Sequence, residues 1–278
     1  MKYYLMDWDD NVMYMPTKIH LQDDEGEVVD MSTHDFAHYR NFIDSKTGKS
    51  KDPSGFEYDG KNIVGLAPNA FEDFSSDSTK FISDVQKAEI GPAWGDFVEA
   101  LNSASLFGII TARGHSPETL KDGVKYLIST QTDGISIEKM IQSLRKRKMK
   151  ANEEYMGDKV EIQKYLDMCL FYPVAYFNKG GSLKPEEVKR DAIIKYKKEI
   201  ENMVDSLNKK MMEKGESAYI LKPVFGFSDD DLKNVEYSST IPGVNIYSTH
   251  GGKKKLHKKG DEEKINEQIT KILKLIKF

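Results

Sequence analysis

The chain has 278 residues, of which 38% are hydrophobic and 31% charged, and its formal net charge is -4. This length allows one large α/β domain with an insertion or two modest domains, and the acidic balance argues against a general affinity for nucleic acid. No apolar stretch approaches the roughly 20 residues that a transmembrane helix needs. The single cysteine, Cys169, cannot form an internal disulfide, which is typical of a reducing cytoplasm. We therefore expect a soluble, cytoplasmic protein with Cys169 in its core.

A short strand and then a polar region are predicted at the start of the chain. Residues 1–6 form an apolar run that acidic residues follow, which is typical of a buried strand in a parallel sheet. The segments 18–21 and 27–30, joined through an acidic turn that contains glycine, predict a β-hairpin. Ser32 or Thr33 then offers an N-cap for a short helix.

Helices and strands alternate regularly in the rest of the sequence, after a long loop predicted over residues 44–60. The predicted elements are a helix from Pro92 through Leu101, a strand over 106–110, a helix capped by Ser116, helical structure over 136–168, a strand over 171–177, a helix from Pro185 to about Lys214, and strands over 219–227 and 245–249. This alternation indicates a three-layer α/β domain built on a parallel sheet.

Two short acidic clusters follow predicted strands of that sheet. Asp7 and Asp9 come directly after the first strand, and Asp229 and Asp230 follow the strand over 219–227. The carboxyl ends of such strands border the crevice where open α/β sheets bind ligands. Because clustered carboxylates repel one another unless a cation or a shared proton offsets them, we expect a divalent metal, most simply Mg²⁺. The alternatives are a solvated turn for the first cluster and a helix N-cap for the second.

The residue types at these strand ends suit phosphoryl chemistry. A carboxylate such as Asp7 can attack phosphorus and give an acyl phosphate that water later hydrolyses. Asp9 can protonate the leaving oxygen and then deprotonate that water. Thr111 lies between a strand and a helix N-terminus, where its hydroxyl and nearby N–H groups can hold a phosphoryl oxygen. Arg113 and His115 flank the same loop and are candidates for substrate contact, with a structural salt bridge as the alternative for Arg113.

Taken together, these segments resemble the four ordered motifs of the haloacid dehalogenase superfamily. The resemblance covers residues 1–15, 105–120 and 222–236. The motifs are Asp7-Trp8-Asp9-Asp10, Thr111, a lysine at a helix start, and Phe227-Ser228-Asp229-Asp230. Asn11 departs from the pattern, because members of the family usually carry Thr or Val there.

The resemblance implies a Rossmann-like core and a Mg²⁺-dependent aspartyl-phosphate mechanism. In that scheme Asp7 is the nucleophile and Asp9 the general acid and base. Thr111 and a lysine would bind the phosphoryl group. From its place in the loop after Thr111, we expect Arg113 to bind it as well. The metal site would consist of Asp7, Asp9, Asp229 and Asp230, with Asn234 making a supporting contact.

The lysine of the third motif has three candidates, Lys179, Lys184 and Lys189, which all precede or begin the helix predicted from Pro185. A positive charge in a first helical turn opposes the helix dipole, so a lysine there needs a reason such as a bound anion. Lys189, followed by Arg190-Asp191-Ala192-Ile193, is most similar to the family pattern and is our first choice. Lys184, at the predicted N-cap, is the second.

The resemblance also implies a division of the chain, because an insertion between the first two motifs forms a cap in this family. We expect a discontinuous core over 1–15 and 92–252, an inserted cap or flap over 16–91, and a basic segment with a C-terminal helix over 253–278.

An acid/base residue at Asp9 favours a phosphatase over a dehalogenase. We expect a Mg²⁺-dependent phosphomonoester hydrolase that acts on a small phosphorylated metabolite or nucleotide, with no membrane partner. One alternative is a nucleic-acid-end phosphatase, for which the basic patches over 145–148 and 253–259 would form a track. The other is a catalytically silent protein of the same fold that binds a ligand or partner.

Overall fold

The computed structural model describes residues 2–44, 46–52, 55–151, 153–178, 184–213 and 222–258. Within these ranges the largest element is a six-stranded sheet in the order β12-β11-β10-β1-β8-β9, parallel except for the edge strand β12. Its strands are β1 (Lys2–Met6), β8 (Phe107–Thr111), β9 (Leu170–Pro173), β10 (Val224–Asp229), β11 (Val244–Ser248) and β12 (Lys255–Lys258). The chain is therefore a mixed α/β protein, as the sequence predicts.

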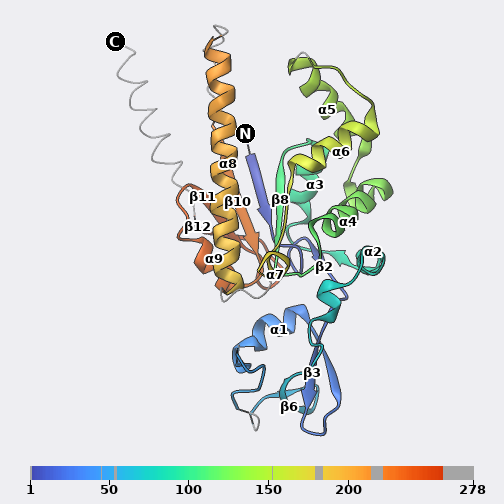
Figure 1. The fold of residues 1–278 in the computed structure, drawn as a ribbon, viewed down its shortest axis with the longest axis vertical. Helices are drawn as coiled ribbons and strands as arrows, with labels where there is room; N and C mark the ends of the chain where they lie inside the picture. Colours follow the sequence, from blue (N-terminus) through green and yellow to red (C-terminus); the bar gives the residue numbers. More distant parts are fainter. Residues whose placement is uncertain are drawn as a thin grey trace.

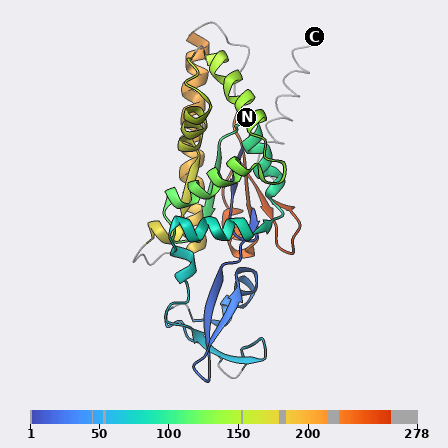
Figure 2. The ribbon, with the colours of Figure 1, turned by 90° about the vertical axis from the view of Figure 1, so that its right-hand side faces the viewer.

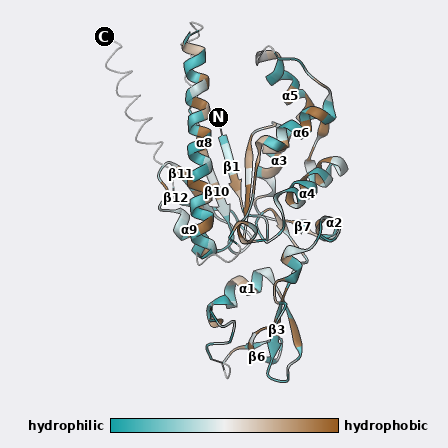
Figure 3. Cartoon of the chain, in the orientation of Figure 1, coloured by the Kyte–Doolittle hydropathy of each residue, from teal (hydrophilic) through white to brown (hydrophobic). Residues whose placement is uncertain are grey.

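Helices cover both faces of this sheet (Figures 1 and 2). On one side lie α3 (Trp94–Asn102), α4 (Pro117–Thr130), α5 (Ile137–Ala151) and α6 (Asp158–Met168). On the other lie α8 (Pro185–Glu213) and α9 (Leu232–Ser238). Two short helical turns, η3 (Thr132–Gly134) and α7 (Val174–Phe177), join these elements. Much of α8 is hydrophilic (Figure 3), and its buried residues, from Val188 to Val204, pack on the sheet.

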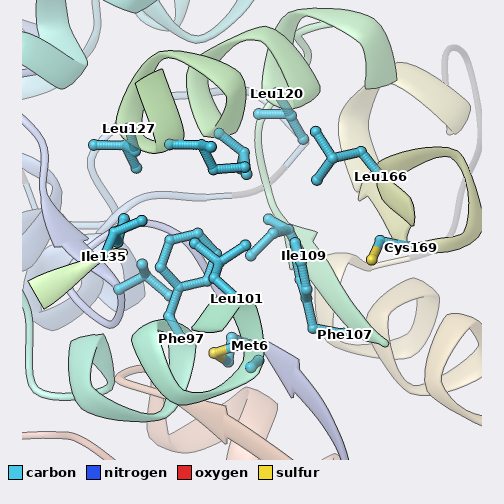
Figure 4. Packing of buried hydrophobic residues seen from close by; sticks show 14 of the residues in the cluster. Met6, Phe97, Leu101, Phe107, Ile109, Leu120, Leu127, Ile135, Leu166 and Cys169 are labelled. Carbon is cyan, nitrogen blue, oxygen red and sulfur yellow. The ribbon is translucent and has the colours of Figure 1, made fainter. Parts of the chain in front are cut away.

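The strand pleat divides the core into two layers. Along β1, Tyr3 and Leu5 face the cluster beneath α8 and α9, whereas Met6 faces the cluster beneath α3 to α6. Successive side chains of a strand point to opposite faces, so a strand covered on both sides must be apolar throughout. Phe107 and Phe97 meet edge to face, with ring centroids 5.5 Å apart, in the larger cluster (Figure 4). Truncating a buried ring of this kind costs about 3–5 kcal/mol.

A second, smaller unit extends beyond the carboxyl ends of β1 and β10 (Figure 1). It is an antiparallel sheet in the order β4-β3-β6-β5 with its own apolar cluster. Its elements are β3 (Lys18–Asp23), β4 (Val28–Ser32), α1 (Thr33–Tyr39), η1 (Arg40–Phe42), β5 (Glu57–Tyr58) and β6 (Lys61–Leu66). We call residues 18–66 the insertion.

The chain returns from the insertion to the main sheet through η2 (Glu72–Ser75) and α2 (Ser78–Lys87). Phe81 and Val85 of α2 belong to the main core, and α2 packs against α4. A two-stranded sheet of β2 (Met13–Tyr14) and β7 (Glu89–Ile90) then joins the outgoing and returning segments. Part of the region that we assigned to the cap, 16–91, therefore packs with the core.

Several predicted elements are confirmed and several boundaries are corrected. The hairpin forms as β3 and β4, Ser32 caps α1, and Ser116 caps α4 through the N–H of Thr119. The predicted loop over 44–60 includes β5, and the helix expected from Pro92 begins at Trp94.

Two longer predictions fail where the backbone breaks. The helical stretch over 136–168 is interrupted before α6, where Gly157 takes a φ of 105° that other residues rarely adopt. The strand expected over 171–177 ends at Pro173, which lacks the N–H that a ladder needs, and α7 follows.

The C-terminal end of the described chain adds to the main sheet. β12 pairs antiparallel with β11, so the basic segment expected from residue 253 begins as an edge strand. The C-terminal helix that we predicted lies outside the described residues. Among the helices that the structure describes, none combines the length and the apolar character that crossing a membrane requires.

Candidate active site

Three carboxylates gather where two neighbouring strands of the main sheet end. β1 and β10 run parallel with Met6 paired to Ser228, and the N–H of Asp7 donates to the Ser228 carbonyl at 2.9 Å. This register brings Asp7 beside Asp229. One carboxylate oxygen from each of Asp7, Asp229 and Asp230 lies within 4.8 Å of the others, and all three residues are buried. The structure thus brings together three of the four acidic residues that we expected at the metal site.

A single buried lysine joins two of these carboxylates. Lys189, on the second turn of α8, places Nζ 2.9 Å from Asp7 Oδ1 and 2.7 Å from Asp229 Oδ2. Of the three candidate lysines, Lys189 is the one that the structure places at the strand ends. Lys184 is exposed just before α8, and Lys179 lies outside the described residues.

Asp229 is held by further donors from the turn that follows it. The Asn234 amide donates to both of its carboxylate oxygens, at 3.0 and 3.1 Å, and the N–H of Asp231 donates to Oδ1 at 3.0 Å. Asp231 in turn caps α9 through the N–H of Lys233. The contact expected from Asn234 is therefore present, and the N-cap is Asp231 rather than Asp229 or Asp230.

The charge at this cluster is not balanced by the described side chains in contact with it. If all three carboxylates were ionised, the one ammonium group in contact with them, Lys189, would leave a charge of -2. Burial raises the pKa of Asp7 well above its ordinary value, with Lys189 opposing the rise and Asp229 adding to it. Burial also raises the pKa of Asp230 well above its ordinary value, and Asp229 and Asp7 add to that rise. Carboxylate oxygens with excess negative charge fit a hard divalent cation such as Mg²⁺.

The carboxylate of Asp9 contacts Arg113 and not the three clustered carboxylates. Arg113 donates from Nε to Asp9 Oδ2 at 2.8 Å and from Nη2 to Asp9 Oδ1 at 2.5 Å. The hydroxyl of Thr111 also donates to Asp9, at 3.3 Å. The carboxylate of Asp9, which we expected to share the metal, is therefore not part of the cluster formed by Asp7 and its neighbours.

Arg113 occupies a closed environment instead of the substrate position that we predicted. Its side chain is fully buried, it donates to Thr17 Oγ1 at 2.6 Å, and its guanidinium lies 5.0 Å from the ring centroid of Phe74 and 5.3 Å from that of Phe81. A buried guanidinium needs such partners because desolvation of an unpaired charge is costly. The structure thus corresponds to the salt-bridge alternative for Arg113.

Asn11 links the ends of three strands through the hydrogen bonds of its side chain. Its amide group donates to the carbonyl of Asp7 at 2.9 Å and to that of Ser228 at 3.1 Å. The hydroxyl of Thr249, just after β11, donates to Asn11 Oδ1 at 2.9 Å. Asn11 therefore fixes the loop after β1 to the ends of two other strands, a role that the sequence pattern did not reveal.

A cavity of about 850 Å³ opens at these strand ends, and the main domain and the insertion both line it. From the main domain come Asp7, Asp9, Thr111, Lys189 and Asp230. From the insertion and the segment that returns from it come Ile19, Thr33, Phe36, Arg40, Phe71 and Phe74. The predicted nucleophile, hydroxyl and lysine thus share one cavity.

Polar contacts join the insertion to the main domain at the edge of this cavity. Arg40 pairs with Asp231, with Nη1 2.7 Å from Oδ2 and Nη2 3.1 Å from Oδ1. The side chain of Thr33 hydrogen-bonds Asp10, whose pKa burial nonetheless raises to about 6. The contact of Arg40 with Asp231 could not be predicted from the sequence, because nothing local to residues 33–42 indicates which surface that segment meets.

His115 is a neutral member of the cavity wall. Its Nε2 lies 2.9 Å from the hydroxyl of Ser76, and its ring packs on Phe81 with centroids 4.8 Å apart. Burial, and then the nearby charge of Arg113, lower the pKa of His115 to about 3. It therefore offers a hydrogen-bonding ring without a positive charge at neutral pH.

Comparison of the chain with family models, with curated proteins and with solved structures gave no match in any of the three.

Proposed function

We propose that this protein is a Mg²⁺-dependent phosphomonoester hydrolase with a Rossmann-like core of the haloacid dehalogenase type. The observation that supports this most is the buried group of Asp7, Asp229 and Asp230. Lys189 contacts Asp7 and Asp229, and the group opens into a cavity. Burying three carboxylates carries a large desolvation cost. Such a group is more readily explained by metal-dependent chemistry than by stability.

The proposed reaction begins with attack of an Asp7 carboxylate oxygen on phosphorus. The phosphorus–oxygen bond to the leaving group breaks, and the departing oxygen takes up a proton that Asp9 must first bind from solvent, because Asp9 is ionised in its pair with Arg113. Water, deprotonated by Asp9, then attacks the aspartyl phosphate and releases inorganic phosphate. Arg113 holds Asp9 in place for both proton transfers.

Two further residues would bind the phosphoryl group. Thr111 and Lys189 both line the cavity, where the hydroxyl of Thr111 contacts Asp9 and the ammonium of Lys189 contacts Asp7. Asp7, Asp229 and Asp230 would hold Mg²⁺, which when bound would offset the negative charge of the phosphoryl oxygens. Fixed charges in a site that excludes water favour the charge that develops in the transition state.

Phosphate release from a panel of phosphomonoesters, with Mg²⁺ and with EDTA, tests this proposal. Asp7→Asn removes the nucleophile with little change of volume and should lower kcat on the order of 10⁴-fold or more. Asp205→Asn, at an exposed position of α8, is the matched control and should retain full activity. Release that survives Asp7→Asn would refute the mechanism, and no release by the native chain would favour a silent ligand-binding protein.

The nucleic-acid alternative receives less support from the described residues. The basic patch over 145–148 lies on α5, at the end of the molecule away from the insertion and the cavity (Figure 1). Within it Arg145 contacts Asp158 at 3.1 Å, and Lys148 contacts Glu153 at 2.7 Å. The patch is thus partly neutralised, and it does not lead to the carboxylates.

A further inference from the structure

Part of the cavity wall is aromatic. Phe36 and Phe71 meet edge to face with ring centroids 5.7 Å apart, and Phe71 and Phe74 do so at 6.0 Å. All three rings line the cavity, together with Ile19. Apart from Phe36 on α1 and Ile19 on β3, the wall comes from the segment that returns from the insertion.

Phe71 is the most exposed of the three rings. It is 44% exposed, whereas Phe74 is covered on one side by the guanidinium of Arg113, 5.0 Å from its centroid. Leaving a phenylalanine ring exposed forgoes the free energy gained by removing apolar surface from water. A cavity lined by aromatic side chains is typical of a site that binds a small molecule.

The cationic side chains that line the cavity already form ion pairs with carboxylates. Arg40 is the cation that the insertion contributes to the described lining, and both of its terminal nitrogens contact Asp231. Lys189 contacts Asp7 and Asp229, and His115 is neutral because burial lowers its pKa. A substrate with a second anionic group would therefore find few described partners here, whereas a planar apolar group would meet three rings.

We propose that the substrate is a phosphomonoester whose leaving group carries a planar aromatic ring, and that Phe71 contacts that ring. This inference rests on the proposed function, since Asp7 and Lys189, which line the same cavity, would receive the phosphoryl group. A volume of about 850 Å³ accommodates a nucleoside monophosphate or an aryl phosphate. Both carry the same chemistry, a phosphate joined to a group with a stacking face.

Turnover of matched substrates gives the first test. Phenyl phosphate and a nucleoside 5′-monophosphate represent the two sources of the ring, and glycerol 3-phosphate and glucose 6-phosphate lack one. The native chain should prefer the ring-bearing pair in kcat/KM by about tenfold or more, the range that stacking on an aromatic side chain provides. Whichever of the two ring-bearing substrates is faster identifies the source of the ring.

Substitutions of Phe71 test whether this residue causes the preference for substrates that carry a ring. Phe71→Ala should reduce the ratio of kcat/KM for phenyl phosphate over glycerol 3-phosphate about tenfold, and Phe71→Tyr should restore it. Tyr237→Ala, on an exposed aromatic of α9 that does not line the cavity, should leave the ratio unchanged. A ratio that Phe71→Ala does not alter would overturn the assignment of Phe71.

A binding measurement separates this inference from the proposed function. Phenylphosphonate and methylphosphonate are not hydrolysed by this route, and calorimetry with the native chain and Mg²⁺ gives their affinities directly. Tighter binding of phenylphosphonate, lost in Phe71→Ala, supports the aromatic site even if no phosphomonoester is cleaved. Equal affinities, or phosphate release that favours glycerol 3-phosphate, would overturn the inference while leaving the hydrolase proposal intact.

Discussion

Arg113 and Asp9 form a buried ion pair in which two guanidinium nitrogens contact the two carboxylate oxygens, at 2.8 and 2.5 Å. The pair joins the loop after β8 to the loop after β1. It neutralises a carboxylate near the cluster of Asp7, Asp229 and Asp230. It therefore serves both the stability of the fold and the orientation of the proposed acid and base.

Removing only one partner of this ion pair should lower the free energy of unfolding. Arg113→Met leaves Asp9 buried without its cation, and we expect a loss of about 3–5 kcal/mol in the free energy of unfolding. Adding Asp9→Leu to that variant should recover part of the loss, because the unpaired charge is then removed. Urea unfolding of both variants measures the difference. A double variant no more stable than Arg113→Met alone would contradict the ion-pair account.

Metal removal should lower the thermal stability of the native chain. A cation that binds the folded cluster at ten times its Kd stabilises it by ~1.4 kcal/mol, so Tm should fall when EDTA replaces Mg²⁺. Asp230→Asn removes one carboxylate of the cluster and should reduce this shift, while Asp205→Asn should preserve it. Differential scanning calorimetry gives both values. An equal shift in the two variants would place the Mg²⁺ elsewhere.

The Arg40–Asp231 contact should restrain the insertion more than it stabilises the fold. Arg40 is partly exposed, so Arg40→Ala should cost no more than about 1 kcal/mol. The amides of residues 33–42 should nevertheless exchange hydrogen faster, because one link to the main domain is lost. Hydrogen exchange read by mass spectrometry measures this. Lys61→Ala, which removes a contact with Asp23 inside the insertion, is the control and should not alter exchange in that range.

His115 should make the fold sensitive to acid. Burial lowers the pKa of His115 to about 3, below the ordinary value of 6.5, so the folded chain keeps the ring neutral. Below about pH 6.5 the unfolded chain takes up a proton that the folded chain refuses, and stability falls as the pH drops toward 3. His115→Gln should weaken this dependence, whereas His250→Gln, at an exposed position, should not. Urea midpoints between pH 7 and pH 4 provide the comparison.

Local patterns in the sequence were sufficient for much of the main sheet. Apolar runs bounded by acidic residues marked β1 and β10, and Ser116-Pro117 marked the start of α4 because a cap and a first-turn proline act within a few residues. Asp7 and Asp229 could be placed together because parallel strands end at one edge. The register that brings them into line is a property of the folded sheet.

Contacts between distant segments were not accessible in this way. Arg113 and Asp9 are separated by 104 positions, and Arg40 and Asp231 by 191. No periodicity or cap links such pairs. The first pairing depends on how β1 and β8 lie side by side, and the second on how the insertion packs on the main domain.

The contacts of Asn11 have a consequence for how the protein can move. The side-chain amide of Asn11 donates to the carbonyls of Asp7 and Ser228, and its oxygen accepts a hydrogen bond from the hydroxyl of Thr249. Three strand ends are thus fixed to one another through a single side chain, so the acidic side chains beside them would keep their spacing if the insertion were displaced. Any displacement of the insertion would then have to arise in the segments that join it to the main domain, and not among the acidic residues at the strand ends.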